Sequence, residues 1–168
     1  MNMLFIIGTT AIFLLAGVLH SLFDITQFEP FKIISPINES IWEHMKMMFY
    51  AILIWSVIEY FIRKNKALSL DCFWFSTLLG LITGIFLVPA IHYTFEAIFG
   101  RTPFIVHLVI VLIIALADRL FIKYIPELYT AGKCKVFDKL SIPVIILLVA
   151  MFTYFTFSPG NTPIFIEA

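Results

Sequence analysis

Charged side chains are scarce in this sequence. Only 13% of its 168 residues are Asp, Glu, Lys or Arg, whereas roughly 25% is usual for a soluble domain. Hydrophobic residues make up 61% of the chain, and the mean hydropathy is +1.02. This composition excludes an ordinary soluble domain and predicts an integral membrane protein. The 11 basic and 11 acidic residues balance, so nothing favours binding to nucleic acid.

Cysteine is also rare. Cys72 and Cys134 are the two cysteines, and they lie too far apart in the sequence to resemble a metal-binding knuckle or a redox pair. We therefore expect free thiols and no cysteine-based framework. Linkers, internal repeats and low-complexity tracts are missing as well, which predicts a single domain over residues 1–168.

Long apolar runs dominate what remains. Five stretches are long enough to cross roughly 30 Å of hydrocarbon as helices, and they lie near 3–23, 46–62, 73–98, 104–123 and 140–158. The predicted fold class is therefore all-α, an integral membrane bundle of five transmembrane helices. No Lys or Arg precedes the first stretch and no small-residue cleavage site follows it, so we interpret it as a retained helix rather than a signal peptide.

The basic residues predict an orientation. The second and fourth connections hold Arg63, Lys64, Lys66, Lys123, Lys133, Lys135 and Lys139. The first has Lys32 with Lys46 at its far edge, and the third has Arg101 alone. Because Lys and Arg favour the cytoplasmic side, we expect a cytoplasmic N-terminus and an extracytoplasmic C-terminus.

The histidines fall on the predicted outer side. His20 and Asp24 end the first stretch and share a helix face, as do His92 and Glu96 near the end of the third. His107 starts the fourth stretch. An imidazole one turn from a carboxylate suits either a metal ligand with its orienting partner or a general base.

The segment SPINESIWEHMK, residues 35–46, concentrates polar residues before the second stretch. If a helix begins here, Glu39, Glu43 and Lys46 share one stripe, and His44 lies about 100° away from Glu43. We predict catalytic roles for Glu39, Glu43 and His44, and substrate binding by Asn38, Trp42 and Lys46. The predicted ligands of zinc or another divalent metal ion are His20, Asp24, His44 and His92.

Structural roles compete with these functional ones. Ser40 and Glu43 form the S-x-x-E pattern of a capping box, in which the glutamate reaches back to the serine amide. The Lys46 side chain can extend to the lipid headgroups. His20 and Asp24 can be ordinary polar residues that are satisfied by hydrogen bonds to neighbouring helices.

Two acids lie deeper in the predicted helices. Asp118 shares a face with His107 three turns away, and it is either a functional intramembrane acid or a residue at the membrane boundary. Glu59 lies one turn from Arg63, and we interpret this pair as an ordinary surface salt bridge.

Residues 38–46 carry a resemblance. The sequence NESIWEHMK matches the pattern N-E-S-x-W-E-H-x-K, preceded by Pro36, and resembles the signature of a family of small bacterial multi-pass membrane proteins of unknown function. The resemblance implies the fold and the importance of the motif, but no activity. Such chains tend to end in P-x-H-x-P-L-F-x-D-P; here Asn161 stands in place of the His and Glu167 in place of the Asp. These departures weaken any ligand role for the tail.

Three classes of function fit the sequence. The first is a metal-dependent hydrolase or transferase in the bacterial cytoplasmic membrane, acting on a lipid or lipid-linked substrate at its outer face. The second is a non-catalytic accessory protein whose motif docks a partner. The third is a proton- or ion-coupled transporter using His107 and Asp118, although the inner halves of most predicted helices lack polar residues.

Overall fold

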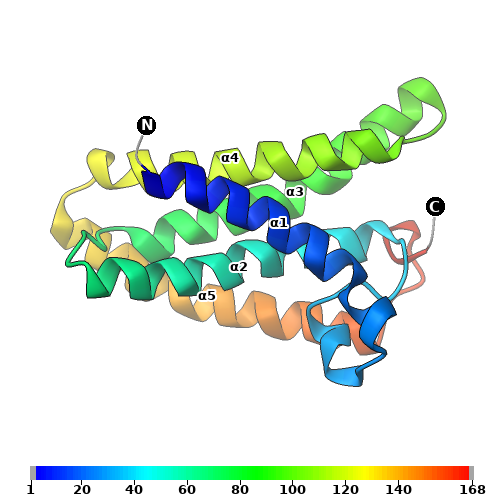
Figure 1. Ribbon diagram of the computed structural model, residues 1–168, viewed down its shortest axis with the longest axis horizontal. Helices are drawn as coiled ribbons and strands as arrows, with labels where there is room; N and C mark the ends of the chain where they lie inside the picture. Colours follow the sequence, from blue (N-terminus) through cyan, green and yellow to red (C-terminus); the bar gives the residue numbers. More distant parts are fainter. Residues whose placement is uncertain (1–2, 167–168) are drawn as a thin grey trace.

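The computed structural model describes residues 3–166 of the chain, which are almost entirely helical (Figure 1). Its long helices are α1 (Met3–Thr26), α2 (Ile41–Asn65), α3 (Phe73–Phe99), α4 (Phe104–Leu128) and α5 (Ala131–Phe157). Two short 3-10 helices, η1 (Glu29–Ile33) and η2 (Pro163–Phe165), lie in the first connection and in the C-terminal tail. Within the described residues, these five helices are each long and apolar enough to cross a membrane.

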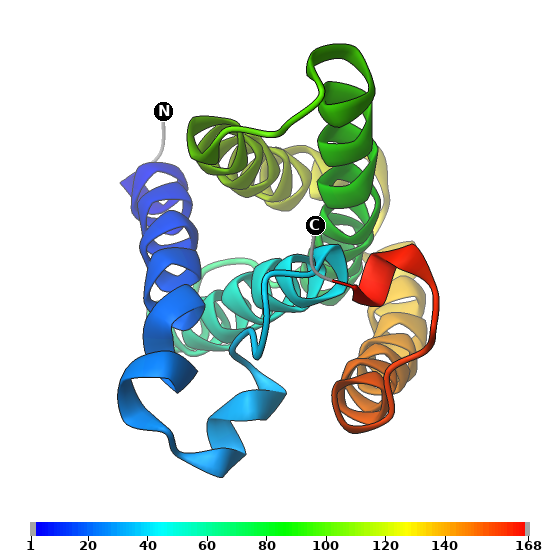
Figure 2. The ribbon, with the colours of Figure 1, turned by 90° about the vertical axis from the view of Figure 1, so that its right-hand side faces the viewer.

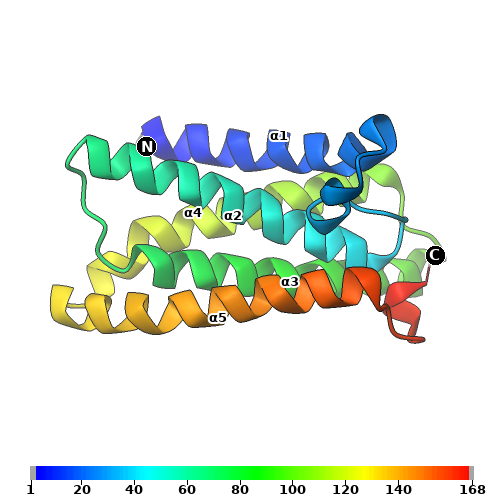
Figure 3. The same cartoon turned by 90° about the horizontal axis from the view of Figure 1, so that it is seen from below.

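Successive helices run in alternating directions along the bundle (Figures 1 and 3). The first and third connections and the C-terminal tail therefore lie at one end, which we call the motif end. The second and fourth connections lie at the other end. The four histidines fall near the motif end, as expected from their positions in the sequence.

Helix α2 has the largest buried share of the five long helices. Seen from the motif end, α1 and α5 flank it and α3 and α4 lie across one of its faces (Figure 2). Every residue from 40 to 52 is buried, including Glu43 and Lys46 of the motif. The motif thus starts the most buried helix, so these two charged side chains must find partners inside the protein.

The outer helices expose apolar side chains. Large examples are Leu14, Phe86, Ile105, Ile146 and Leu147, each at least 59% exposed. An apolar surface of this extent on all sides is costly in water but matches the hydrocarbon of a bilayer.

The five predicted stretches are confirmed as helices, but their ends differ. Helix α2 begins at Ile41 rather than near 46, and α5 begins at Ala131 rather than near 140. Helix α4 continues through Pro126 to Leu128. The predicted stretches are shorter because hydropathy ends them at the first charged turn, whereas the helical hydrogen bonds continue through that turn.

The expectation of free thiols is wrong. Cys72 and Cys134 form a disulfide across 62 residues of sequence. Because α3 and α5 both begin at the same end of the bundle, a large sequence separation becomes a direct contact. The bond joins the second connection to the first turn of α5, so we call this the disulfide end.

We predict that the disulfide stabilises the bundle by closing a long loop in the unfolded chain. Cys72→Ser should lower the free energy of unfolding by about 2–4 kcal/mol. Thermal unfolding in detergent would measure the effect. Cys134→Ser and the double variant should cost about as much as the single change, since all three remove the same bond; additive losses would contradict this account.

Candidate functional site

The start of α2 is organised by three short-range hydrogen bonds. The Ser40 hydroxyl accepts from the Glu43 amide at 3.4 Å, and the Asn38 side-chain oxygen accepts from the Ser40 amide at 3.1 Å. The Glu43 carboxylate accepts from the Ile37 amide at 3.1 Å. The serine half of the predicted capping box is confirmed. The glutamate half is wrong, because Asn38 already satisfies the Ser40 amide.

Glu43 and Lys46 form a buried ion pair. The Lys46 side chain is 0% exposed, and its Nζ lies 2.5 Å from Glu43 Oε2. The same Nζ donates to the Lys32 carbonyl at 2.7 Å and to the Thr156 hydroxyl at 3.2 Å. The expectation that Lys46 extends to the headgroups is therefore wrong. The pair instead ties α2 to the first connection and to α5.

Trp42 lies inside an aromatic cluster. Its ring centroid lies 4.8–5.3 Å from those of Phe152, Phe155 and Phe165. Phe165 belongs to η2, so the tail packs over the motif (Figure 2). Asn161, in the same tail, is exposed, and Glu167 lies outside the described residues. Trp42 and Asn38 thus shape the motif, and their predicted contact with substrate stays a prediction.

His20, Glu39 and His44 converge on one point. Glu39 Oε2 lies 3.7 Å from His20 Nε2 and 3.6 Å from His44 Nε2. One ligand atom from each residue lies within 4.8 Å of the other two. The carboxylate beside His20 therefore comes from Glu39, whereas Asp24 is exposed on the last turns of α1. Three predicted site residues thus meet, although α1, the first connection and α2 supply one each.

A backbone contact sets the orientation of His44. Its Nδ1 lies 2.9 Å from the Ser40 carbonyl oxygen. A carbonyl oxygen only accepts, so Nδ1 carries the proton, and in the neutral ring the lone pair lies on Nε2, facing Glu39. A histidine ligand is commonly fixed in this way, with one nitrogen donating to the backbone and the other free for a metal ion.

A row of imidazoles continues from His44 toward α3. The ring of His107 stacks on that of His44, with centroids 5.3 Å apart. His107 Nε2 lies 3.2 Å from His92 Nδ1, and His92 Nε2 lies 3.6 Å from the Glu96 carboxylate. His92, a predicted metal ligand, therefore lies behind His107 rather than against His20 and Glu39.

A pocket of about 260 Å³ opens beside this cluster. His20, Glu39, His44 and His107 form its polar part, while the rest is lined mainly by apolar side chains of α1, α2 and α4 such as Phe13, Met47, Met48, Phe104 and Leu108. Glu43 and Lys46 point away from this pocket, since they pair with the first connection and α5.

A second polar cluster lies in the half of the bundle nearer the disulfide end. Arg119 is 2% exposed and donates to both Asp118 and Glu59. Glu59 also accepts from Trp55 at 2.9 Å and from Arg63 at 2.8 Å. The interpretation of Glu59 and Arg63 as a surface pair is wrong, because Glu59 is 0% exposed. Its buried partner, Arg119, lies 60 residues away in the sequence. The spacing of residues along one helix therefore could not predict this contact.

Two glycines make room for these charges. A Cβ atom at Gly8 would lie 2.7 Å from the Arg119 side chain, and a Cβ at Gly80 would overlap the Asp118 carboxylate. Helices α1 and α3 thus approach the buried ions closely enough that any larger side chain would collide.

The two polar clusters are separated by an apolar layer. Met48, Ile52, Leu81, Ile114 and Ala115 are at most 1% exposed and lie between His107 and Asp118 along the helices. A continuous polar route through the membrane would have to cross this layer.

The fold and site together define a small all-helical bundle of membrane-spanning length with a histidine- and carboxylate-lined pocket at one end. The chain belongs to a family of unknown function, DUF6512, whose family model matches residues 1–168. No curated protein and no solved structure matches it significantly.

We predict that Gly80→Ala destabilises the protein by about 1–3 kcal/mol, because the added methyl group overlaps a buried carboxylate. Gly17→Ala is the matched control, since a Cβ at Gly17 meets nothing within 4 Å. This control should be neutral or stabilise α1 by up to about 1 kcal/mol. Thermal unfolding in detergent compares the two variants, and equal stability would argue against tight packing at Gly80.

We also predict a structural cost for breaking the motif ion pair. Glu43→Gln leaves the buried Lys46 charge uncompensated and should lower the free energy of unfolding by about 3–5 kcal/mol. Glu29→Gln removes the partner of Lys32 in a largely exposed pair and should cost less than about 1 kcal/mol. The same unfolding measurement tests both; similar small losses would mean that Glu43 contributes little to the fold.

Proposed function

We propose that this protein is an integral membrane enzyme that binds a divalent metal ion, such as zinc, through His20, Glu39 and His44. It hydrolyses, or transfers a group from, a lipid or lipid-linked substrate. The convergence of these three side chains at the wall of a largely apolar pocket is the observation that carries the proposal.

The donor set suits zinc. Two imidazoles and one carboxylate leave the fourth tetrahedral position open for water, as catalytic zinc sites do. With bonds of 2.0–2.2 Å, neighbouring ligand atoms on such an ion lie roughly 3.3 Å apart, close to the 3.6 and 3.7 Å that separate Glu39 from the two histidines. Small side-chain movements would close this geometry.

The pocket suits an amphiphilic substrate. Its polar groups gather near the cluster, and apolar side chains line most of the remainder. An acyl or prenyl chain can occupy the apolar part while the group to be cleaved lies against the metal ion. A fully polar substrate would leave this surface without matching contacts.

Residues of the chain supply the proton transfer. A divalent ion held by His20, Glu39 and His44 would activate a water molecule for attack on the carbonyl or phosphoryl centre of the substrate. His107 lines the same pocket and stacks on His44, so it is the nearest further imidazole to receive the proton of that water and return it to the leaving oxygen. Water is thereby added across the cleaved bond.

We place the protein in the bacterial cytoplasmic membrane with the site facing outward, because Lys and Arg gather at the opposite end. The disulfide favours the reverse orientation, since such bonds persist mainly in oxidising compartments. The chemistry proposed for the site is the same in either orientation.

We predict that tag-free protein purified in mild detergent contains about one equivalent of zinc or another transition metal. Elemental mass spectrometry would measure it. His20→Ala and His44→Ala should each lose the metal, because each removes one of three ligands. His92→Ala is the matched control and should keep it, since His92 contacts His107 instead.

The outcomes separate the remaining functions. Folded wild-type protein that binds no metal, even after incubation with excess zinc, would overturn the metalloenzyme and favour a role in docking a partner. Loss of metal in the His92 variant as well would contradict the assigned ligand set. Retention in the control and loss in the other two would justify screening lipid esters and phosphoesters as substrates.

A further inference from the structure

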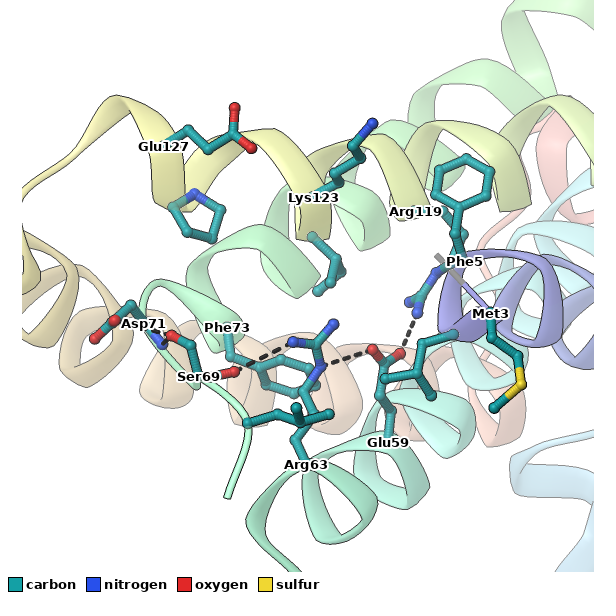
Figure 4. Close-up of a pocket in the computed structure, with 14 residues that line it drawn as sticks. Met3, Phe5, Glu59, Arg63, Ser69, Asp71, Phe73, Arg119, Lys123 and Glu127 are labelled. Carbon is teal, nitrogen blue, oxygen red and sulfur yellow. Dashed lines mark hydrogen bonds and ion pairs between the residues drawn. The ribbon is translucent and has the colours of Figure 1, made fainter. Parts of the chain in front are cut away.

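A larger cavity lies at the disulfide end, far from the histidines. Its volume is about 540 Å³, within the range that binds small molecules. The first turn of α1, the ends of α2 and α4 and the second connection line it (Figure 4). The proposed function makes no use of this space.

The cavity has apolar walls around a charged floor. Phe5, Leu68, Phe73 and Ile122 are among the apolar residues that line it, and Glu59, Arg63 and Arg119 form its floor. Figure 4 shows the Glu59 carboxylate between the two guanidinium groups. Such a combination suits a molecule with one polar group and an apolar remainder.

The two arginines are held in place before any ligand arrives. Arg63 donates through Nε to Glu59 at 2.8 Å and through a terminal nitrogen to the Ser69 carbonyl at 3.2 Å. In Figure 4 its other terminal nitrogen points into the cavity. Arg119 is fixed by Asp118 and Glu59. Guanidinium groups fixed in this way lose little conformational entropy when they bind an oxyanion.

Glu59 does not leave an isolated negative charge in the floor. Its two oxygens already accept hydrogen bonds from Trp55, Arg63 and Arg119. The two arginines thus balance Glu59 and Asp118, since Arg119 also pairs with Asp118, and each guanidinium keeps further N–H donors for another acceptor.

The charged lining of the cavity is balanced, with Arg63, Arg119 and Lys123 against Glu59, Asp71 and Glu127, but the disulfide end as a whole carries an excess of basic residues. Eight basic residues belong to the disulfide end, namely Arg63, Lys64, Lys66, Arg119, Lys123, Lys133, Lys135 and Lys139. Five acidic residues accompany them, namely Glu59, Asp71, Asp118, Glu127 and Asp138. Among the described residues, the motif end carries three basic and five acidic residues. The disulfide end thus has the positive potential that attracts phosphate-bearing headgroups.

We propose that this cavity binds the phosphate of a phospholipid headgroup, with Arg63 and Arg119 as donors and the apolar walls against the glycerol and upper acyl chains. Basic pockets between membrane helices bind lipid headgroups by this chemistry. The site does not depend on the metal cluster, so either proposal can fail without the other.

Native mass spectrometry of the delipidated full-length protein in detergent tests the proposal. Phosphatidylethanolamine, phosphatidylglycerol and phosphatidylcholine are added separately, and the fraction of protein that retains one lipid is measured. Arg63→Gln should weaken retention at least about tenfold, because a charge-assisted hydrogen bond is lost. Lys64→Gln is the matched control: it removes a neighbouring exposed cation that does not line the cavity and should retain lipid as the wild type does.

Leu68→Trp is a second, independent test, which is needed because the Arg63 variant could fail to fold. Leu68 lines the cavity and is 42% exposed, so a larger side chain fills the space without touching the buried ions. This variant should also lose lipid while unfolding at an unchanged temperature.

Two results would overturn the proposal. The first is equal retention of lipid by the wild type and by the Arg63, Leu68 and Lys64 variants, or no retention by any of them. The second is binding of inorganic phosphate, with the same dependence on Arg63 but without any lipid retained, which would assign the cavity to a soluble phosphate compound.

Discussion

The buried charge of Arg119 is the constraint to which most of the bundle conforms. Transferring a guanidinium out of water costs several kcal/mol unless carboxylates lie against it. Asp118 and Glu59 supply them from α4 and α2, while Gly8 of α1 and Gly80 of α3 leave the space. Four of the five long helices therefore meet around the cluster of Glu59, Asp118 and Arg119, and their relative positions follow from satisfying its charges.

The motif combines two tasks on opposite faces of α2. Glu43 and Lys46 face the first connection and α5, where they form the buried pair. His44 faces the other way, toward His20 and Glu39. The structural face fixes the first turns of α2, and this fixes the position at which His44 presents its nitrogen. The dense polar segment beside apolar helices thus combines residues that hold the fold together with residues of the candidate site.

Much of the fold could be predicted from the sequence, because hydropathy alone locates five long helices. The histidine cluster was also predictable, since alternating helices bring the ends of α1, α2 and α3 together. The interaction partners of individual residues were harder to predict from the sequence. Spacing paired His20 with Asp24, but the loop residue Glu39 takes that place. The contact of Glu59 with Arg119 and the bond between Cys72 and Cys134 depend on how helices pack laterally, which no local pattern encodes.

The burial of α2 bears on how the protein would enter a membrane. Among the five helices, α2 has the lowest hydropathy, 1.5, and the largest buried share, 61%. It carries Glu43, Lys46 and Glu59, whose charges would be costly in lipid before their partners arrive. Lys46 reaches Thr156 and Glu59 reaches Arg119, both synthesised much later. We therefore expect the stable insertion of α2 to depend on α4 and α5.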